Sequence, residues 1–216
     1  MEISPLLITL KTSAVATVIT FFAGIFLAYV VCNMKRGKSP VDAIIMLPLV
    51  LPPTVAGFFL LLVFGKRSAF GQFMLQFDIT FVFTWKAAVI AAAVVSLPLM
   101  YRTTRGAFEQ LDPNIISAAR TLGVSESKIF LRIVLPNARA GILAGTVLAF
   151  TRAAGEFGAT IIFAGNVPGV TQTMSTAIYA AVQANDYDMA FKWAILLATF
   201  SMVFIFAMNA VIKGRH

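Results

Sequence analysis

Arg152 and Glu156 are the two charged residues in an otherwise apolar stretch, residues 141–163. They lie four positions apart, so on a helix their side chains share one face and can form an ion pair. A charge at the centre of a bilayer costs on the order of 2.5–3.5 kcal/mol on insertion scales, and pairing offsets part of that cost. The pair could line or gate the path of an anion, with Arg152 supplying positive potential and Glu156 preventing the ion from being trapped. It could equally be a structural pair within the helix or at a subunit interface, and the sequence leaves both interpretations open.

Other kinds of chemical site find little support in the sequence. With one cysteine, Cys32, and one histidine, His216, neither an intrachain disulfide nor a Cys/His metal site is expected. The triplet Gly37-Lys38-Ser39 matches the end of a nucleotide-binding P-loop, but Cys32 stands where the first glycine belongs and an apolar stretch precedes it. We therefore expect no catalytic residues, no cofactor, no metal and no ATPase site.

The composition places these residues in a lipid environment. Hydrophobic residues make up 59% of the chain and charged residues 12%, with a mean hydropathy of +0.88. Soluble domains carry roughly one quarter charged residues, so this much apolar surface could not be buried in one soluble core. A net charge of +8 would suggest nucleic acid as the partner of a soluble protein. In a membrane protein the placement of the cations matters more, and no nucleic acid is expected.

Apolar stretches long enough to cross a bilayer, which takes roughly 20 residues, recur along the chain. They are residues 13–32, 43–64, 79–101, 141–163 and 193–212. The sequence therefore predicts an all-α, polytopic membrane protein in which residues 1–216 form one domain with five transmembrane helices. The cations Lys35–Lys38 follow the first stretch instead of preceding it, which favours a retained helix over a cleaved signal peptide.

The distribution of Lys and Arg predicts the orientation in the membrane. If the N-terminus is outside, the inner segments hold Lys35, Arg36, Lys38, Arg102, Arg105, Arg120, Lys128, Arg132, Arg139, Lys213 and Arg215, and the outer segments hold Lys11, Lys66, Arg67, Lys86 and Lys192. Cytoplasmic segments of membrane proteins are enriched in such cations. The expected orientation is therefore N-terminus outside and C-terminus in the cytoplasm.

Proline and small residues mark two of the apolar stretches. The second contains Pro48, Pro52 and Pro53, each of which removes a backbone donor and can kink a helix. Such a helix could line a conduit or could simply be bent for packing; Pro52 and Pro53 therefore join Arg152 and Glu156 as provisional pathway or gate residues.

The fourth stretch has small residues at every fourth position, which permit close helix approach at a dimer seam or at an internal contact. These are Gly141, Gly145, Ala149 and Ala153.

The polar segment 102–139, cytoplasmic by the charge rule, predicts a compact knob of two short helices at residues 112–135. Asp112 can cap the first helix, with Pro113 at its first position. Gly123 can supply the left-handed residue that ends it. Ser125 can cap a second helix, which Pro136 would end.

At these positions the sequence resembles the EAA motif of ABC importer permeases, which reads E-A-A, three residues, G, nine residues, I-x-L-P. The matching residues are Ala118, Ala119, Gly123, Ile133, Leu135 and Pro136, and Ser117 stands where the family often has Glu. The resemblance implies that the knob is the coupling helix pair, which docks into a cleft on an ATPase subunit. The departure at Ser117 puts in doubt any ion pair made by that Glu, but not the helix–glycine–helix shape.

Further segments are similar to molybdate permeases, and sulfate permeases share some of them. They are residues 47–53, 119–123, 155–160, 165–169 and 171–173. The short region before residue 13 fits the molybdate type better than the longer sulfate type. This resemblance implies a type I ABC importer permease fold (MetI-like) in the bacterial cytoplasmic (inner) membrane, without an ATPase site of its own. It also implies a homodimer, two cytoplasmic ABC ATPase subunits and an extracytoplasmic oxyanion-binding protein. The expected substrate is molybdate, or tungstate, with sulfate or another tetrahedral oxyanion as the alternative.

The sequence also predicts the structure of an outer segment, and it weighs against two other functions. Residues 165–190 contain Met174, Ile178, Ala181 and Val182 at helical spacing, which predicts a short amphipathic helix that either docks the binding protein or forms a lid. A secondary transporter would usually show internal repeats, and five spans cannot form two equal halves. A membrane enzyme would need a cluster of nucleophile, base or metal ligands, which the sequence does not show.

Overall fold

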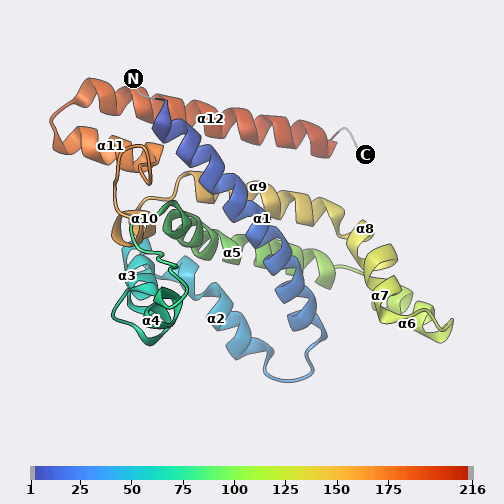
Figure 1. The fold of residues 1–216 in the computed structure, drawn as a ribbon. Coiled ribbons are helices and arrows are strands. Elements are labelled where there is room, and N and C mark those ends of the chain that lie inside the picture. The colour runs from blue at the N-terminus through green and yellow to red at the C-terminus, as the bar shows by residue number, and fades with distance from the viewer. Residues whose placement is uncertain (1–2, 214–216) are drawn as a thin grey trace.

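The computed structural model describes residues 3–213 and the side chains of residues 3–206, and every regular element in this part of the chain is helical (Figure 1). This confirms the predicted all-α class. Arg215 and His216, on which part of the orientation and metal arguments depended, lie outside the described residues, as does the side chain of Lys213. In chain order the elements are α1 (Ser4–Asn33), α2 (Lys38–Val50), α3 (Pro53–Phe64), α4 (Ala69–Leu75), α5 (Trp85–Glu109), α6 (Pro113–Thr121), α7 (Glu126–Ile129), the π-helical turn η1 (Phe130–Val134), α8 (Leu135–Asn137), α9 (Arg139–Ala154), α10 (Gly158–Phe163), α11 (Met174–Gln183) and α12 (Tyr187–Lys213).

Three described helices, α1, α5 and α12, are long and apolar enough to cross a membrane, and the number rises to five if each of two bent pairs counts as one span. The third predicted stretch differs at its start, because the helix begins at Trp85 instead of Ile79. Thr84 ends the preceding irregular segment by accepting a hydrogen bond from the Ala87 N–H at 3.4 Å. Hydropathy alone could not place this boundary, since residues 79–84 are as apolar as the helix that follows.

The second predicted stretch, residues 43–64, is not one helix. It is divided into α2 and α3, which are bent by 112° relative to each other. Pro52 takes an extended conformation with ψ 134° and Pro53 occupies the first position of α3. Since neither proline can donate a backbone hydrogen bond, α2 ends before them and the chain starts a new helix in another direction. Pro48 lies inside α2 and does not end it.

The fourth predicted stretch, residues 141–163, is also interrupted. Helix α9 runs from Arg139 to Ala154, and α10 begins only at Gly158. A second bend, of 72°, lies where the segment Glu126–Asn137 meets α9. The apolar composition of the stretch therefore concealed a break at residues 155–157, which places Glu156 between two helices instead of within one.

The long helices pack through small residues. A Cβ atom on Gly24 of α1 would lie 2.6 Å from Met100 Cγ of α5, and one on Gly141 of α9 would lie 2.5 Å from Ala107 Cβ. Gly145 faces Met100 and Thr103 of the same helix α5. The small-residue face of α9 is therefore an internal contact with α5 in the single chain, which decides between the two interpretations left open by the sequence.

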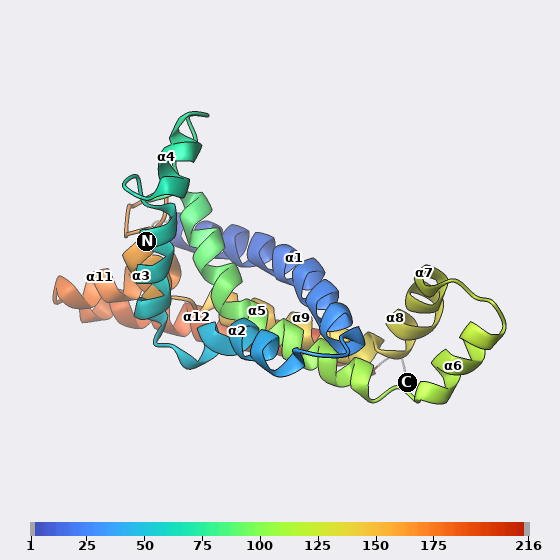
Figure 2. The same cartoon turned by 90° about the horizontal axis from the view of Figure 1, so that it is seen from below.

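The two ends of the molecule carry different elements (Figures 1 and 2). One end holds α3, α4, α10 and α11, and the other holds α6, α7 and α8. Helix α11 is the amphipathic helix predicted in segment 165–190, with Met174, Ala177 and Ala181 buried. A capping box between Thr173 and Thr176 starts it. The Met174 N–H donates to Thr9 Oγ1 of α1 at 2.8 Å, so the start of α11 is fixed against α1.

Candidate functional site

The knob, residues 112–135, projects from the end of the bundle opposite α11 (Figure 2). Its first helix starts as the sequence predicted. Asp112 Oδ1 accepts a hydrogen bond from the Asn114 N–H at 2.9 Å, and Pro113 occupies the first helical position. Both features satisfy or remove donors that would otherwise be unpaired at a helix start.

Gly123 ends α6 in the left-handed conformation, with φ +73°. The Val124 N–H donates to the Ala119 carbonyl at 3.1 Å, and the Gly123 N–H donates to the Arg120 carbonyl at 2.9 Å. These two bonds define a Schellman motif. No heavy atom lies within 4 Å of where a Cβ atom would be on Gly123. The glycine is therefore required for its backbone conformation and not for space.

The second half of the knob differs from the prediction. Ser125 occupies the N-cap position of α7, but its side chain makes no capping hydrogen bond. Helix α7 continues through the π-helical turn η1 into α8, which ends at Asn137, one residue beyond the predicted stop at Pro136. A π turn closes with hydrogen bonds that span one residue more than in an α-helix. This wider turn lets the chain continue into a proline that cannot donate a hydrogen bond of its own.

The residues of the EAA-like motif fall into two groups. Ala119 is buried in the core cluster at the root of the knob, and Ile133 and Leu135 pack against that cluster. The others are on the surface: Ser117, Ala118, Gly123 and Pro136. Ser117 Oγ donates to the Pro113 carbonyl at 2.9 Å, so its contact stays within the helix and no charge is involved.

An ion pair that was not predicted from the sequence joins the two halves of the knob. Arg120 Nε lies 2.6 Å from Glu126 Oε1, and Arg120 Nη2 lies 3.1 Å from Glu126 Oε2. The hydrogen bond from Arg120 lowers the pKa of the Glu126 carboxyl, and the same bond raises the pKa of Arg120. The two-pronged contact bridges the Gly123 turn. Opposite charges on the two sides of a predicted glycine turn were the available signal.

The knob also exposes large apolar side chains that the motif does not include. Ile115 is 50% exposed, Leu122 is 82% exposed and Leu131 is 61% exposed. Leu122 directly precedes Gly123, Ile115 lies in α6 and Leu131 lies in η1. Exposed apolar area on a protruding element is available to bind a partner protein.

The breaks of the two interrupted stretches meet in space. A Cβ atom on Gly57 of α3 would lie 2.7 Å from Ala159 Cα of α10, and one on Gly158 would lie 2.9 Å from Pro53 Cβ. Pro52, Pro53, Arg152 and Glu156 were predicted together as pathway or gate residues, although no sequence pattern indicates that they are close in space. The structure brings Pro53 against the start of α10, next to the segment that carries Glu156, while Pro52 is exposed.

Arg152 and Glu156 form the predicted ion pair, although only Arg152 lies in α9. Arg152 Nη1 is 2.6 Å from Glu156 Oε2, with side-chain exposures of 27% and 2%. The other carboxylate oxygen, Oε1, accepts a hydrogen bond from the Ala159 N–H at 2.7 Å. Glu156 thus links the last turn of α9 to the first turn of α10, where a cation and an anion respectively suit the helix dipoles. Because Glu156 neutralises Arg152 at contact distance, the guanidinium offers an anion only a weakened attraction.

Within the described residues, no group of three or more His, Cys, Asp and Glu side chains is placed to hold a metal ion. One end offers a protrusion with exposed apolar side chains, and the opposite end holds a neutralised charge pair beside the crossing of α3 and α10 (Figure 1).

Comparison with protein families relates this architecture to transport. Residues 20–214 match the model of the binding-protein-dependent transport system inner membrane component. The chain is 42% identical over 205 residues to the putative molybdenum transport system permease protein YvgM of Bacillus subtilis, covering 94% of this chain and 90% of that protein. It is 45% identical over 184 residues to the molybdenum transport system permease protein ModB of Escherichia coli K12, covering 84% and 80%. It is 35% identical over 205 residues to the sulfate transport system permease protein CysT of Salmonella typhimurium, covering 94% and 74%.

Solved structures share the fold at low sequence identity. The MetNI methionine ABC transporter in an inward-facing conformation superimposes with a TM-score of 0.78 at 16% identity, covering 97% of this chain and 94% of that chain. A bacterial ABC transporter that imports alginate superimposes with a TM-score of 0.80 at 18% identity, covering 98% and 78%.

Proposed function

The chain belongs to the family of binding-protein-dependent transport system inner membrane components, and from that premise we propose that it conducts molybdate into the cell as the permease subunit of an ABC importer. A permease of this family is the transport channel of its complex and not its ATPase. The chain is accordingly a multi-pass protein of the cytoplasmic membrane. The observation that carries the substrate assignment is the identity of 42% and 45% to two molybdenum permeases over most of both chains.

The proposed complex contains two copies of this chain, two ATPase subunits in the cytoplasm and one extracytoplasmic binding protein. Five spans in one chain enclose too little space for a sealed pathway, which supports a homodimer. The end with the knob carries Arg120, Lys128 and Arg132, and this supports a cytoplasmic knob, an outer N-terminus and an inner C-terminus. Helix α11, at the opposite end, would then face the binding protein, with Tyr179 and Val182 each 43% exposed.

The knob is proposed as the surface that transmits movement of the ATPase subunits. Its helices are held by the Schellman motif at Gly123 and by the Arg120–Glu126 pair, so it can move as a rigid unit. Its exposed apolar side chains, above all Leu122, provide the contact area for a cleft on the ATPase. Of the motif residues, Ser117, Ala118, Gly123 and Pro136 would face the partner, while Ala119, Ile133 and Leu135 would hold the knob on its base.

The crossing of α3 and α10 is proposed as part of the pathway or its gate. Two helices that break at the same depth free backbone groups, and in a bilayer such groups must face protein or a water-filled path. The Arg152–Glu156 pair beside the crossing supplies charge that attracts an oxyanion weakly. Weak attraction suits a pathway, because tight binding would slow release.

The experiment that tests this function measures ATP hydrolysis by the complex of this chain with its ATPase and binding protein in liposomes. Molybdate, tungstate and sulfate are added separately with the loaded binding protein. We expect molybdate to stimulate hydrolysis most strongly, and tungstate to act similarly because it is a tetrahedral dianion of similar size. Stimulation by sulfate alone would assign the chain to sulfate import. Uptake that needs a proton gradient and no ATP would instead indicate a secondary transporter.

A further inference from the structure

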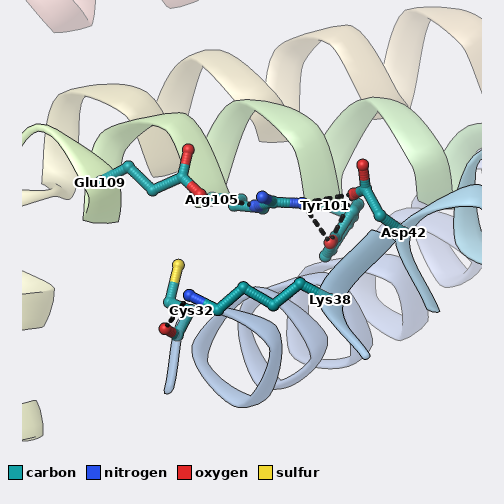
Figure 3. Close-up of polar contacts among 6 residues, drawn as sticks. All are labelled: Cys32, Lys38, Asp42, Tyr101, Arg105 and Glu109. Atoms are coloured by element: carbon teal, nitrogen blue, oxygen red, sulfur yellow. Dashed lines mark hydrogen bonds and ion pairs between the residues drawn. The ribbon is translucent and has the colours of Figure 1, made fainter. Parts of the chain in front are cut away.

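A polar cluster joins α2 to the C-terminal end of α5 (Figure 3). This end of α5 leads into the knob and is called the stem of the knob below. Tyr101, Arg105 and Glu109 follow one another at every fourth position on α5, so they share a face of that helix. Asp42 comes from α2. The Tyr101 hydroxyl donates to Asp42 Oδ1 at 2.8 Å, and Arg105 Nη1 donates to the same oxygen at 2.5 Å. Arg105 Nε donates to Glu109 Oε1 at 2.7 Å.

The exposed fraction of the side chains in this cluster increases from the core toward the solvent. Tyr101 is completely buried, whereas the side chains of Arg105, Asp42 and Glu109 are 21%, 40% and 50% exposed. A cavity of about 280 Å³ lies over it, lined by Asp42, Met46, Arg102, Arg105, Gly106 and Glu109. Tyr101 and Arg105 of α5 both donate hydrogen bonds to the same carboxylate oxygen of Asp42. These bonds hold Asp42, and with it α2, in a defined position against α5.

Helix α2 packs Val41, Ile45 and Met46 against the main core cluster, and these side chains are only partly buried. None of its residues is fully buried. Its start is held by Lys38, whose Nζ donates to the Cys32 carbonyl at the end of α1 at 2.9 Å. Its end is the 112° bend into α3. With no fully buried side chain of its own, α2 depends on the contact between Asp42 and α5 more than a core helix would depend on one polar contact.

The position of the cluster in the chain gives it a mechanical role. Glu109 is the last residue of α5, and α6 of the knob begins at Pro113. Helix α2 leads through Pro52 into α3, whose Gly57 contacts Ala159 of α10. The knob is thus connected to Arg105 through the end of α5, and Arg105 is connected to the α3–α10 crossing through Asp42 and α2.

We propose that Asp42, Arg105 and Glu109 form a relay that makes α2 follow the stem of the knob, so that movement driven by the ATPase changes the α3–α10 crossing. The inference rests on the proposed function, since it assigns the relay to coupling between ATP hydrolysis and transport. All three are positioning residues, and none is required to touch the oxyanion. Without the relay, the knob and the ATPase still engage, but α2 no longer follows them.

The test measures two rates in the same liposomes, which contain the full complex with its ATPase and binding protein. The ratio of molybdate imported to ATP hydrolysed is compared for wild type, D42N, R105Q and the double variant. D42N keeps the shape of the side chain and removes the charge that holds Arg105. The control is R102Q, which removes a cation from the wall of the same cavity but not from the relay.

We expect D42N and R105Q each to lower the ratio by about fivefold or more, the lower end of a typical coupling free energy, while ATP hydrolysis and assembly of the complex persist. The double variant should be no worse than either single variant, because both remove the same contact. R102Q should keep the wild-type ratio.

The following outcomes separate the relay from its alternatives. A wild-type ratio in D42N and R105Q overturns the relay. A parallel fall of uptake and hydrolysis with an unchanged ratio also overturns it, because that pattern indicates a purely structural contact. If R105Q does not assemble, D42N and Y101F, which removes one donor to Asp42, decide the question. If wild type imports tungstate or sulfate but not molybdate, the substrate assignment fails, and the ratio measured with that oxyanion still tests the relay.

Discussion

Arg120 and Glu126 make a two-pronged contact, 2.6 Å at one pair of atoms and 3.1 Å at the other, across the turn that Gly123 forms. The contact joins the two halves of the knob, which is the proposed docking surface for the ATPase subunit. Several properties of the knob follow from the charge of Glu126 and the conformation of Gly123, and they can be measured separately.

The first prediction concerns pH. The hydrogen bond from Arg120 lowers the pKa of Glu126, so the pair contributes fully above the ordinary glutamate pKa and is lost as pH falls through the lower value in the folded protein. The affinity of the ATPase subunit for wild type and for E126Q should therefore differ by a constant amount between pH 6 and 8. The difference should vanish in acid, where protonated Glu126 resembles Gln. A difference that grows as pH falls would contradict this account.

The second prediction concerns Gly123. Its φ of +73° costs a residue with a Cβ atom about 1–2 kcal/mol, and there is no clash to add to that cost. G123V should weaken attachment of the ATPase subunit clearly, and G123N should weaken it less because asparagine tolerates this conformation. Gly106 offers a matched control, since it also has no atom within 4 Å of a Cβ atom but lies inside α5. Equal effects of G106V and G123V on attachment would show that conformation is not what Gly123 supplies.

The third prediction concerns the crossing of α3 and α10. G57A places a methyl group 2.7 Å from the Ala159 backbone, so the two helices must separate. Overpacking of this kind typically costs about 1–3 kcal/mol, so we expect a lower thermal midpoint and slower uptake. G155A is the control, because its nearest atom is the Thr151 carbonyl oxygen at 3.6 Å. A normal midpoint and normal uptake in G57A would mean that the crossing is looser than the structure indicates.

The fourth prediction distinguishes the partners of the buried pair. R152Q leaves a carboxylate that is 2% exposed without its cation, and breaking a buried pair in this way costs about 3–5 kcal/mol. E156Q keeps an oxygen that can accept from the Ala159 N–H, and it leaves the charge on Arg152, which is 27% exposed. R152Q should therefore reduce the amount of folded protein more than E156Q does.

The transport phenotype of E156Q tests the gate. With Arg152 no longer neutralised, the oxyanion should be held longer and uptake should fall at equal protein levels. Normal uptake by E156Q at equal protein levels would remove the pair from the gate and leave it a structural contact.

The features that the sequence predicted correctly are mostly local. Asp112, Pro113 and Gly123 each act within one turn of chain, so residue type and spacing were sufficient to place them. The pairing of Arg152 with Glu156 also follows from spacing alone, and it survives even though the helix ends between them.

The features that were missed depend on direction and on distant contacts. Hydropathy reports that residues 43–64 are apolar but not that Pro52 and Pro53 turn the chain by 112°. The contact between Asp42 and Arg105 joins residues that are 63 positions apart, and it exists only because α2 packs along α5 in one register. No local pattern could have selected Asp42 as the partner of Arg105.

We propose that this chain couples ATP hydrolysis by a separate subunit to oxyanion import. Uptake of labelled molybdate by liposomes with the complete complex tests it most directly, with and without ATP, and with a proton gradient imposed or collapsed. We expect uptake that requires ATP and the loaded binding protein and that does not change with the proton gradient. Uptake that continues without ATP, or that stops when the proton gradient is collapsed, would contradict it.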